Sequence, residues 1–258
     1  MNKSPKISII TISFNSENTI KETIESVLSQ DYKNIEYIII DGNSTDKTKS
    51  IIGSYRGKIS YFVSEKDNGI YDAMNKGIKS STGAIIGILN SDDFYMNNSV
   101  ISEVVDKITK CNSDTLYADL LYVNPEDTNI IKRYWKSGEF NRVKFEKGWM
   151  LPHPTFFVKK EIYNKFGLYS DKLKSAADYE MILRLLYKNN VSTTYLNKIT
   201  VKMRDGGYSN QSFWSRIKGN KEDIKSWKMN NLKAPTFLRI RKPLSKISQY
   251  IKRPKNNE

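Results

Sequence analysis

The clearest indication of the fold is the stretch Gly83-Ala84-Ile85-Ile86-Gly87-Ile88-Leu89-Asn90-Ser91-Asp92-Asp93-Phe94. Its apolar part is too short for a typical helix and ends directly in two adjacent carboxylates. A continuous apolar run is typical of a parallel strand that is buried on both faces, and the carboxyl ends of such strands border the ligand crevice of open α/β sheets. We therefore expect Asp92 and Asp93 to lie in a crevice with a cation or several hydrogen-bond donors. The alternative is that Ser-Asp-Asp simply starts a turn.

Three further strand-to-helix units precede this stretch, each with a β-rich run followed by residues of helical periodicity. Two of these runs end in acidic loops, at 41–46 and at 64–69. Successive units of this kind imply a parallel sheet with right-handed crossovers. A single acidic residue could simply cap the next helix, but its repetition along one sheet edge favours a binding site. The predicted strands are 7–14, 35–40, 59–63 and 83–89, and the predicted helix after the first strand spans 17–30.

The composition fits one large domain, alone or with a C-terminal extension. The 258 residues are 38% hydrophobic, which is enough to bury a substantial core. The single cysteine, Cys111, cannot form an internal disulfide, which fits a reducing compartment. The amino terminus lacks the apolar region of a signal peptide, and no stretch reaches the roughly 18 apolar residues of a membrane-spanning helix. We therefore expect a cytoplasmic protein.

The positive charge is concentrated at the carboxyl end. Residues 214–258 contain 13 Lys or Arg and 3 Asp or Glu, a net charge of +10 out of the total of +14. A basic segment mixed with apolar residues can lie on an anionic membrane surface, and a solvated helical tail is the alternative. A nucleic-acid-binding protein would instead carry basic and aromatic residues on its folded domain, whereas here acidic residues gather where a ligand is expected.

Four motifs follow one another between residues 6 and 95. They are Ser-Ile-Ile-Thr-Ile-Ser-Phe-Asn at 8–15, Ile-Ile-Ile-Asp-Gly-Asn-Ser-Thr-Asp at 38–46, Gly-Ile-Tyr-Asp-Ala-Met-Asn-Lys-Gly-Ile at 69–78 and Leu-Asn-Ser-Asp-Asp at 89–93. In this order they resemble the family-two inverting glycosyltransferases of the GT-A fold, and among them the bacterial enzymes of O-antigen and other surface-polysaccharide assembly. The resemblance implies an α/β fold, Rossmann-like, with a mixed, mostly parallel sheet flanked by helices.

The resemblance also implies a nucleotide-sugar site. It places the uridine of a UDP-sugar at the end of the first two strands, and a carboxylate there can accept a hydrogen bond from the imide N–H of uracil. Lys66 and Asp67 would line the same pocket, unless their loop is only a solvated charged turn. Ser91 and Asp92 would contact the nucleotide sugar from the fourth strand. The residues implied for the uridine are Thr11, Ser13, Asn15 and Asp41.

The Asp-x-Asp metal motif of the family falls on Asn90-Ser91-Asp92, so an amide stands where the first acid is usual. This departure makes Asp92 the favoured metal ligand and Asp93 a second candidate. Mg²⁺ or Mn²⁺ needs only one or two carboxylates when a diphosphate and waters complete its coordination. Such an ion would neutralise the charge that develops on UDP as the glycosidic bond breaks.

Inversion by single displacement requires a general base that accepts the proton of the acceptor hydroxyl. The segment Ser175-Ala176-Ala177-Asp178-Tyr179-Glu180 resembles the Glu-Asp-Tyr block of the family, with Ala177 where Glu is common. The resemblance therefore assigns the base to Asp178. The alternative is that Asp178 only complements the dipole of the helix that starts there.

The second half contributes further candidates. Segments 116–123 and 129–135 are predicted to be strands of an antiparallel hairpin. Trp149 could stack on a sugar or pack as an ordinary core or rim aromatic, and His153 could contact a phosphate or the acceptor or serve structurally. The segment Arg204-Asp205-Gly206-Gly207-Tyr208-Ser209 matches the Gly-Gly-x-Ser loop of the family, where Gly206 and Gly207 would contact the acceptor or phosphate.

These inferences predict a GT-A domain over 1–211, with a nucleotide-sugar half at 1–95 and an acceptor half at 96–211, followed by a basic helical extension at 212–258. The expected activity is metal-dependent transfer of a hexose or N-acetylhexosamine from a UDP-sugar to a polyprenyl-diphosphate-linked saccharide, with a β-linkage as product. The expected location is the cytoplasmic face of the inner membrane. A sugar-nucleotide pyrophosphorylase is the alternative on a related sheet, but its glycine-rich phosphate loop is absent from the sequence.

Overall fold

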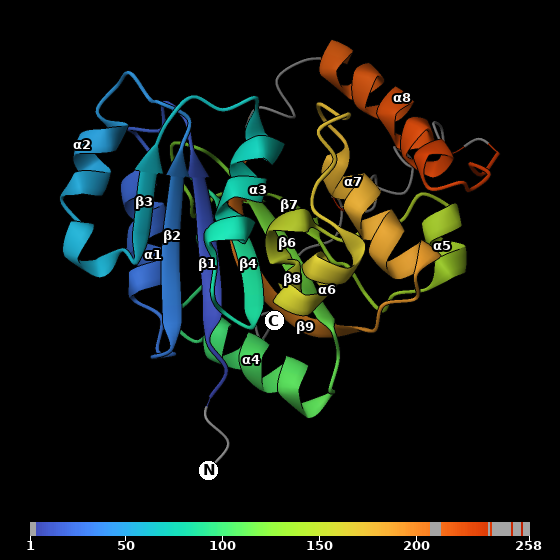
Figure 1. Ribbon diagram of the computed structural model, residues 1–258, viewed down its shortest axis with the longest axis horizontal. Helices are drawn as coiled ribbons and strands as arrows, with labels where there is room; N and C mark the ends of the chain where they lie inside the picture. Colours follow the sequence, from blue (N-terminus) through green and yellow to red (C-terminus); the bar gives the residue numbers. More distant parts are fainter. Residues whose placement is uncertain (1–3, 207–212, 237, 239–248, 250–253, 255–258) are drawn as a thin grey trace.

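Nine strands of the described chain form one mixed sheet in the order β3-β2-β1-β4-β8-β6-β9-β5, with β7 paired to β6 (Figure 1). The computed structural model describes residues 4–206, 213–236, 238, 249 and 254, and it describes 213–220 by their backbone alone. The four strands nearest the amino terminus are mutually parallel, as predicted. The strands are β1 Ile7–Ser13, β2 Ile35–Asp41, β3 Tyr61–Ser64, β4 Ile85–Asn90, β5 Asp93–Tyr95, β6 Thr115–Val123, β7 Ile131–Trp135, β8 Phe157–Lys159 and β9 Thr193–Arg204.

Helices flank the sheet, so the fold class predicted from the sequence is confirmed. In Figure 1, α3 crosses in front of the parallel strands and α1 lies behind them. Helices α7 and α8 lie side by side on the right of the view, away from β1, β2 and β3. The helices are α1 Ile20–Leu28, α2 Thr48–Gly53, α3 Ile70–Ser80, α4 Val100–Lys110, α5 Arg142–Glu146, α6 Lys160–Phe166, α7 Ala177–Ile182 and α8 Phe213–Met229, with short 3₁₀ turns η1 Arg56–Lys58 and η2 His153–Thr155 and a π-helix η3 Leu183–Lys188.

Polar pairs fix the register of β1 on β2. Every residue of β1 is buried, including its two serines, and a buried hydroxyl requires a partner. Ser8 lies opposite Glu36 and donates to its carboxylate, and Ser13 lies opposite Asp41 and does the same at the other end of the pair. A slip of one residue would leave both carboxylates without these donors.

The second half of the chain adds antiparallel strands to the sheet. The predicted hairpin is confirmed, because β6 and β7 pair antiparallel, and β8 joins β4 to β6. Two local predictions were wrong. The first helix begins at Ile20 and not at residue 17, because the chain first makes a turn at Asn15 with a φ of 48°. A short strand, β5, starts at Asp93, where a crevice loop was expected.

The described part of the C-terminal extension packs on the second half of the domain. Trp227 of α8 is buried and donates its indole N–H to the Tyr179 hydroxyl of α7 at 2.8 Å. The side chain of Asn230 donates to Glu180, also on α7, at 2.9 Å. Glu222 accepts from the backbone N–H groups of Lys174 and Ser175 just before α7. The helix therefore holds the start and one face of α7.

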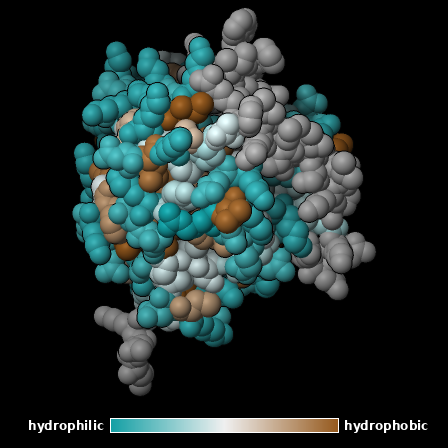
Figure 2. Space-filling view, turned by 90° about the vertical axis from the view of Figure 1, so that its right-hand side faces the viewer, coloured by the Kyte–Doolittle hydropathy of each residue, from teal (hydrophilic) through white to brown (hydrophobic). Residues whose placement is uncertain are grey.

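The outer surface on this side is mainly hydrophilic among the described residues, and hydrophobic residues form small separate patches (Figure 2). Trp227 of α8 is not part of this surface, because its side chain is buried and donates to Tyr179 of α7. None of the helices searched among the described residues combines the length and the apolar character that crossing a membrane requires.

Glu36 provides a test of the polar pairing between β1 and β2. It accepts hydrogen bonds from the Ser8 hydroxyl and from the Thr82 N–H and hydroxyl, at 2.5 to 2.7 Å. Burial alone raises the pKa of Glu36, but the hydrogen bonds from Ser8, Thr82 and Lys6 outweigh it and lower the pKa from 4.5 to about 2. Because the folded-state pKa is depressed, ionised Glu36 stabilises the fold above its unfolded pKa, and this stabilisation is lost as the pH falls from 4.5 toward about 2.

We expect Glu36→Gln to lower the free energy of unfolding by roughly 1–3 kcal/mol at neutral pH. The difference from the wild type is expected to shrink progressively below pH 4.5, as measured by urea unfolding over a pH series. The exposed Glu126→Gln variant is the matched control. A deficit for Glu36→Gln that stays constant across the series would contradict this account.

Candidate active site

Asp41 ends β2 and its side chain is completely buried. Its Oδ1 accepts from the hydroxyls of Ser13 and Ser44 at 3.0 and 2.5 Å, and its Oδ2 accepts from the Ser44 N–H and the Ser64 hydroxyl at 2.9 and 2.6 Å. Four hydrogen bonds use the ordinary acceptor capacity of a carboxylate. In this structure Asp41 therefore ties together the carboxyl ends of β1, β2 and β3.

A second carboxylate, Asp67, lies beside the end of β2. Its Oδ1 accepts from the N–H of Gly69 at 2.9 Å, and its Oδ2 lies 2.6 Å from the point that a Cβ on Gly42 would occupy. The same point is 3.4 Å from the ring of Phe14, which is 62% exposed. A side chain at position 42 would intrude on the carboxylate and reach the ring, so the glycine keeps a carboxylate and an open aromatic surface together.

The other residues implied for the nucleotide lie nearby and differ in accessibility. Thr11 is completely buried, and its hydroxyl hydrogen-bonds that of Tyr37 at 3.1 Å. Asn15 joins the two strand ends, because its Oδ1 accepts from the N–H of Thr45 at 2.9 Å. Lys66 is exposed. The structure thus brings the β1 and β2 ends and the 64–69 loop to one edge of the sheet.

Asn90, Asp92 and Asp93 form an oxygen-rich cluster at the end of β4. The side-chain N–H of Asn90 donates to Asp93 Oδ2 at 2.9 Å. Asn90 Oδ1 and Asp93 Oδ1 are both buried and accept no hydrogen bond from the described residues. Burial raises the pKa of Asp93 well above its usual value, and the neighbouring charge of Asp92 raises it further. Burial also raises the pKa of Asp92, which keeps some exposed surface.

The loop at 91–93 is fixed from α1. The hydroxyl of Thr23 bonds to the carbonyl oxygens of both Ser91 and Asp93, at 2.9 and 2.8 Å. The Ser91 hydroxyl, in turn, is hydrogen-bonded to that of Ser16 at 2.7 Å. The predicted contact residue Ser91 therefore also links this loop to the loop after β1.

Arg204, at the end of β9, holds the same loop from the other side. Its Nη1 donates to the carbonyl oxygen of Asp92 at 2.7 Å, and its Nη2 pairs with Glu22 of α1. The guanidinium also lies 5.0 Å from the centre of the Phe94 ring. Only 7% of the Arg204 surface is exposed, and its side chain links β9 to α1 and to the acidic loop.

This cluster fits a hard divalent cation. Mg²⁺ and Mn²⁺ prefer carboxylate and amide oxygens, and two unpartnered buried oxygens beside Asp92 offer such ligands. Within the described residues, no group of three or more His, Cys, Asp or Glu side chains could hold a metal. An ion here would therefore rely on Asp92, Asp93 and the Asn90 amide, with a diphosphate and waters completing its shell.

Asp178 lies in the first turn of α7 and is partly exposed. Its Oδ1 accepts a hydrogen bond from the hydroxyl of Tyr71 at 3.1 Å. Tyr71 is in the first turn of α3, directly after the 64–69 loop, so the contact brings Asp178 to the carboxyl edge of the parallel strands. An acid at this place can accept a proton from a hydroxyl that approaches the sheet edge.

Glu180, the other acid of this turn, is buried, and its carboxylate already has partners. It pairs with Arg184 at 3.0 Å and accepts from Asn230 at 2.9 Å. It therefore links α7 to the residue that follows α8 and is a less suitable base than Asp178.

His153 and Trp149 are both built into the interior. His153 is buried, and its Nε2 is hydrogen-bonded to the Tyr169 hydroxyl at 2.6 Å. Burial lowers the pKa of His153, and the charge of Asp178 opposes this shift. The partly buried Trp149 donates its indole N–H to the Ser137 carbonyl at 2.7 Å. Its ring meets that of Tyr117 edge-on, at 5.8 Å between centroids.

The glycine loop lies at the limit of the described chain. Gly206 has a φ of 100°, a backbone conformation that favours glycine. Gly207, Tyr208 and Ser209 lie outside the described residues.

Four residues of the site were not singled out from the sequence: Phe14, Tyr71, Tyr169 and Arg204. Three of them lie inside quoted motifs, so motif membership was a usable signal. Tyr169 carries no comparable signal, because its contact with His153 depends on the fold.

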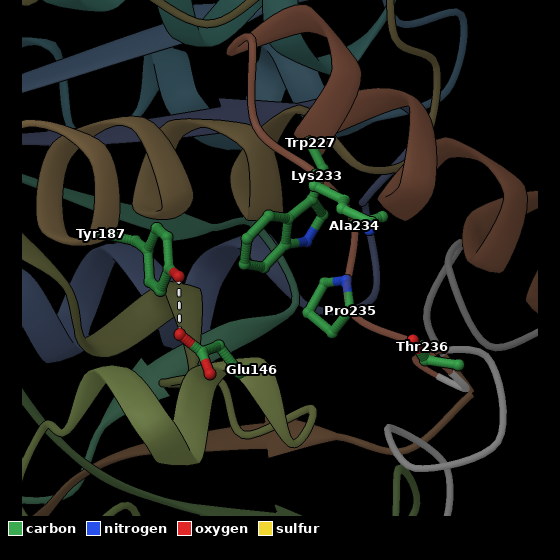
Figure 3. Close-up of a pocket in the computed structure, with 7 residues that line it drawn as sticks. All are labelled: Glu146, Tyr187, Trp227, Lys233, Ala234, Pro235 and Thr236. Carbon is green, nitrogen blue, oxygen red and sulfur yellow. Dashed lines mark hydrogen bonds between the residues drawn. The ribbon is translucent and has the colours of Figure 1, made fainter.

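A separate cavity of about 240 Å³ lies where the segment after α8 meets α5 and η3 (Figure 3). In it the ring of Tyr187 faces that of Trp227, and the Tyr187 hydroxyl donates to Glu146 at 2.7 Å. None of the predicted site residues lines this cavity. Its lining residues are Glu146, Tyr187, Trp227, Lys233, Ala234, Pro235 and Thr236.

Comparison with solved structures supports the fold. The structure of Staphylococcus aureus TarS 1–349 in complex with UDP-GlcNAc superposes with a TM-score of 0.69 at 21% identity, over 87% of this chain and 65% of TarS. A mannosyltransferase from Pyrobaculum calidifontis in complex with GDP-Man and Mn²⁺ superposes with a TM-score of 0.66 at 16% identity, over 93% of this chain and 69% of that enzyme. Both likenesses concern the fold alone.

Sequence comparison identifies the family. An uncharacterized glycosyltransferase of Rickettsia typhi is 32% identical over 78% of this chain, which spans 64% of that relative's length. An uncharacterized glycosyltransferase of Mycobacterium tuberculosis is 32% identical over 71% of this chain and 70% of its own length. A PGL/p-HBAD biosynthesis glycosyltransferase of Mycobacterium bovis is 25% identical over 80% of each chain. The sequence model described as glycosyl transferase family 2 matches residues 8–167, and the chain is therefore a family 2 glycosyltransferase with a GT-A fold.

Proposed function

We propose that this enzyme transfers a hexose or N-acetylhexosamine from a UDP-sugar to an acceptor hydroxyl with inversion, with Asp178 as general base. The observation that carries the proposal is the pair of buried, unpartnered oxygens of Asn90 and Asp93 beside Asp92, at the carboxyl end of β4. An open α/β sheet binds its ligand at this edge. TarS, which shares the fold, binds UDP-GlcNAc.

The nucleoside would bind between Phe14 and the 64–69 loop. The exposed ring of Phe14 offers a stacking surface for a base, and the Asp67 carboxylate beside Gly42 offers an acceptor for its N–H. Asp41, whose oxygens are already satisfied, would support this pocket from below. Thr11, Ser13 and Asn15 would shape it through the same strand ends.

The diphosphate would lie over the acidic loop. A Mn²⁺ or Mg²⁺ ion held by Asp92 and Asp93, when bound, supplies positive charge to the departing UDP. Thr23 and Arg204 keep the loop in place through its carbonyl oxygens. The fixed loop needs little reorganisation during the reaction, which is a general source of catalytic rate.

The transfer itself is a single displacement. The acceptor oxygen attacks the anomeric carbon as the bond from that carbon to the UDP oxygen breaks, and Asp178 takes the proton of the attacking hydroxyl. An α-linked donor then gives a β-linked product. The hydroxyl of Tyr71 holds one oxygen of Asp178, which leaves the other oxygen to receive the proton.

The acceptor in this proposal is a saccharide linked to polyprenyl diphosphate, in the assembly of O-antigen, capsule or another surface polysaccharide. Two features support it. The relative from Mycobacterium bovis is named a PGL/p-HBAD biosynthesis glycosyltransferase. Residues 214–258 carry a net charge of +10, which suits an anionic membrane surface. Gly206 would border this acceptor side, and His153 and Trp149 would support it from the interior.

The central test is a donor panel. We expect UDP release from one UDP-hexose or UDP-N-acetylhexosamine in the presence of Mn²⁺ or Mg²⁺ and a lipid-linked acceptor, and its loss on chelation with EDTA. Asp92→Asn is expected to lower kcat by roughly 10²–10³-fold with little change in melting temperature, because it removes charge from the diphosphate site. Asp106→Asn, an exposed residue of α4, is the control. Full turnover in EDTA, or release only from GDP-sugars, would overturn the metal or the UDP assignment respectively.

Asp41, at the end of β2, and Asp67, which lies beside that end, are expected to respond differently to replacement by asparagine. Asp41→Asn replaces an acceptor of two hydrogen bonds by an N–H₂ group, and we expect it to lower the free energy of unfolding by about 2 kcal/mol or more. Asp67→Asn retains Oδ1 for Gly69, so stability is preserved while affinity for UDP falls about tenfold, which is roughly 1.4 kcal/mol. Denaturant unfolding and calorimetric titration with UDP measure both. Unchanged UDP affinity in Asp67→Asn would remove this residue from the pocket.

The basic carboxyl end is tested with vesicles. We expect the full chain to cosediment with vesicles that contain phosphatidylglycerol, and binding to weaken as salt is raised because the attraction is electrostatic. Neutral phosphatidylcholine vesicles are the control. A protein that never pellets with anionic vesicles at low salt would end the membrane proposal and leave the transfer chemistry untouched.

A further inference from the structure

We propose that Tyr71 is a positioning residue for Asp178 and that, through α3, it links the donor loop to the general base. The inference rests on the proposed function, because it assumes that Asp178 is the base. The inference concerns α3, which carries Tyr71, whereas the proposed base is on α7, 107 positions further along the sequence.

The first observation is the contact itself. Tyr71 is buried, and its hydroxyl donates to Asp178 Oδ1 at 3.1 Å. Burial raises the pKa of Tyr71 well above its usual value, and the charge of Asp178 raises it further. The phenol therefore keeps its proton over the working pH range and acts toward Asp178 as a donor. A donor of this kind stabilises the ionised carboxylate, the form that can accept a proton.

The second observation is that the Tyr71 ring is held rigidly. It stacks on Tyr169 with 5.8 Å between centroids and 20° between planes. One turn along α3, the side chain of Asn75 bonds both the N–H and the carbonyl oxygen of Tyr169, each at 2.9 Å. Gly77 allows α3 to approach β1, because a Cβ there would collide with Ile10. The hydroxyl is thus fixed relative to the sheet and to the segment before α7.

The third observation is the direct connection to the donor loop. Tyr71 follows Gly69, which adopts a φ of 112° at the start of α3 and donates its N–H to Asp67. Asp72 accepts from the N–H of Asn68 at 3.0 Å. The first turn of α3 and the loop proposed to bind the nucleoside therefore form one hydrogen-bonded unit. The hydroxyl that orients Asp178 is therefore held in a fixed position relative to the loop proposed to bind the nucleoside.

The groups around Asp178 identify Tyr71 as its direct donor. His153, on η2, faces Asp178 from the second half, and burial lowers its pKa so that the ring tends to be neutral. The charge of Asp178 also raises the pKa of Tyr169, although burial is the larger cause. Among these three neighbours, Tyr71 is the one with a hydrogen bond to the carboxylate.

The test is Tyr71→Phe in the full-length enzyme, which removes the hydroxyl and keeps the stacked ring. We expect kcat for UDP release to fall at least tenfold, with KM for the UDP-sugar within about twofold of wild type, because the donor site keeps its contacts. The acid limb of the pH profile of kcat is expected to move to higher pH, since the ionised base loses a donor. A purely structural role for Tyr71 would not move that limb.

Tyr163→Phe is the matched control, because it removes a buried hydroxyl from the same aromatic group, on a ring that lies 6.4 Å from that of Tyr169 between centroids and has no hydrogen bond to Asp178 among the described residues. Equal kcat and equal pH profiles for the Tyr71 and Tyr163 variants would overturn the proposal. Should Tyr71→Phe fold poorly, 3-fluorotyrosine at position 71 keeps the ring and donates more strongly, so the acid limb is expected to move to lower pH. An unmoved limb would then count against the role of Tyr71.

Asp178→Asn separates this inference from the proposed function. Loss of turnover in Asp178→Asn together with normal kinetics in Tyr71→Phe would reject the positioning role and leave the base in place. Full turnover in Asp178→Asn would reject the base itself.

Discussion

A buried carboxylate at the end of β2 sets the geometry on which the site depends. Asp41 has no exposed surface, and a charge in such a place is costly unless donors surround it. Three serines supply those donors, one from β1, one from the loop after β2 and one from β3. These hydrogen bonds therefore hold the carboxyl ends of β1, β2 and β3 next to one another. They also fix the positions at which the following loops begin. Phe14 and Asp67, which both lie beside Gly42, leave the sheet from these fixed strand ends.

The parallel half could be predicted from the sequence because its strands are continuous apolar runs that end in polar loops. The hairpin of β6 and β7 was equally visible. The inward position of Asp93 could not be predicted, because it depends on pairing between β5 and β9, which lie far apart in the chain. The four donors of Asp41 were hidden for the same reason, since Ser13 and Ser64 reach it only across neighbouring strands. Motif resemblance indicated which residues gather at the edge, but not which of them are already satisfied.

The described part of the C-terminal extension has a structural function that its charge does not reveal. Trp227 and Asn230 bind one face of α7, and Glu222 accepts from the backbone just before that helix. From the other side, Tyr71 and Asn75 of α3 bind Asp178 and the segment around Tyr169. The helix that carries Asp178 is therefore held between α3 and α8. Removing α8 would release one of the two supports of the proposed base.

The acids of the site differ chiefly in how many hydrogen-bond donors surround each one, and this difference supports the separate functions proposed for them. Asp41 accepts four hydrogen bonds and is a structural anchor. Asp93 accepts one from Asn90, and its other oxygen is buried without a partner among the described residues, so that oxygen favours a cation. Asp178 is partly exposed, with one oxygen held by Tyr71 and the other available for the proposed role as base. In the proposed function, the same side chain would thus serve as an anchor, a metal ligand or a base according to the donors that surround it.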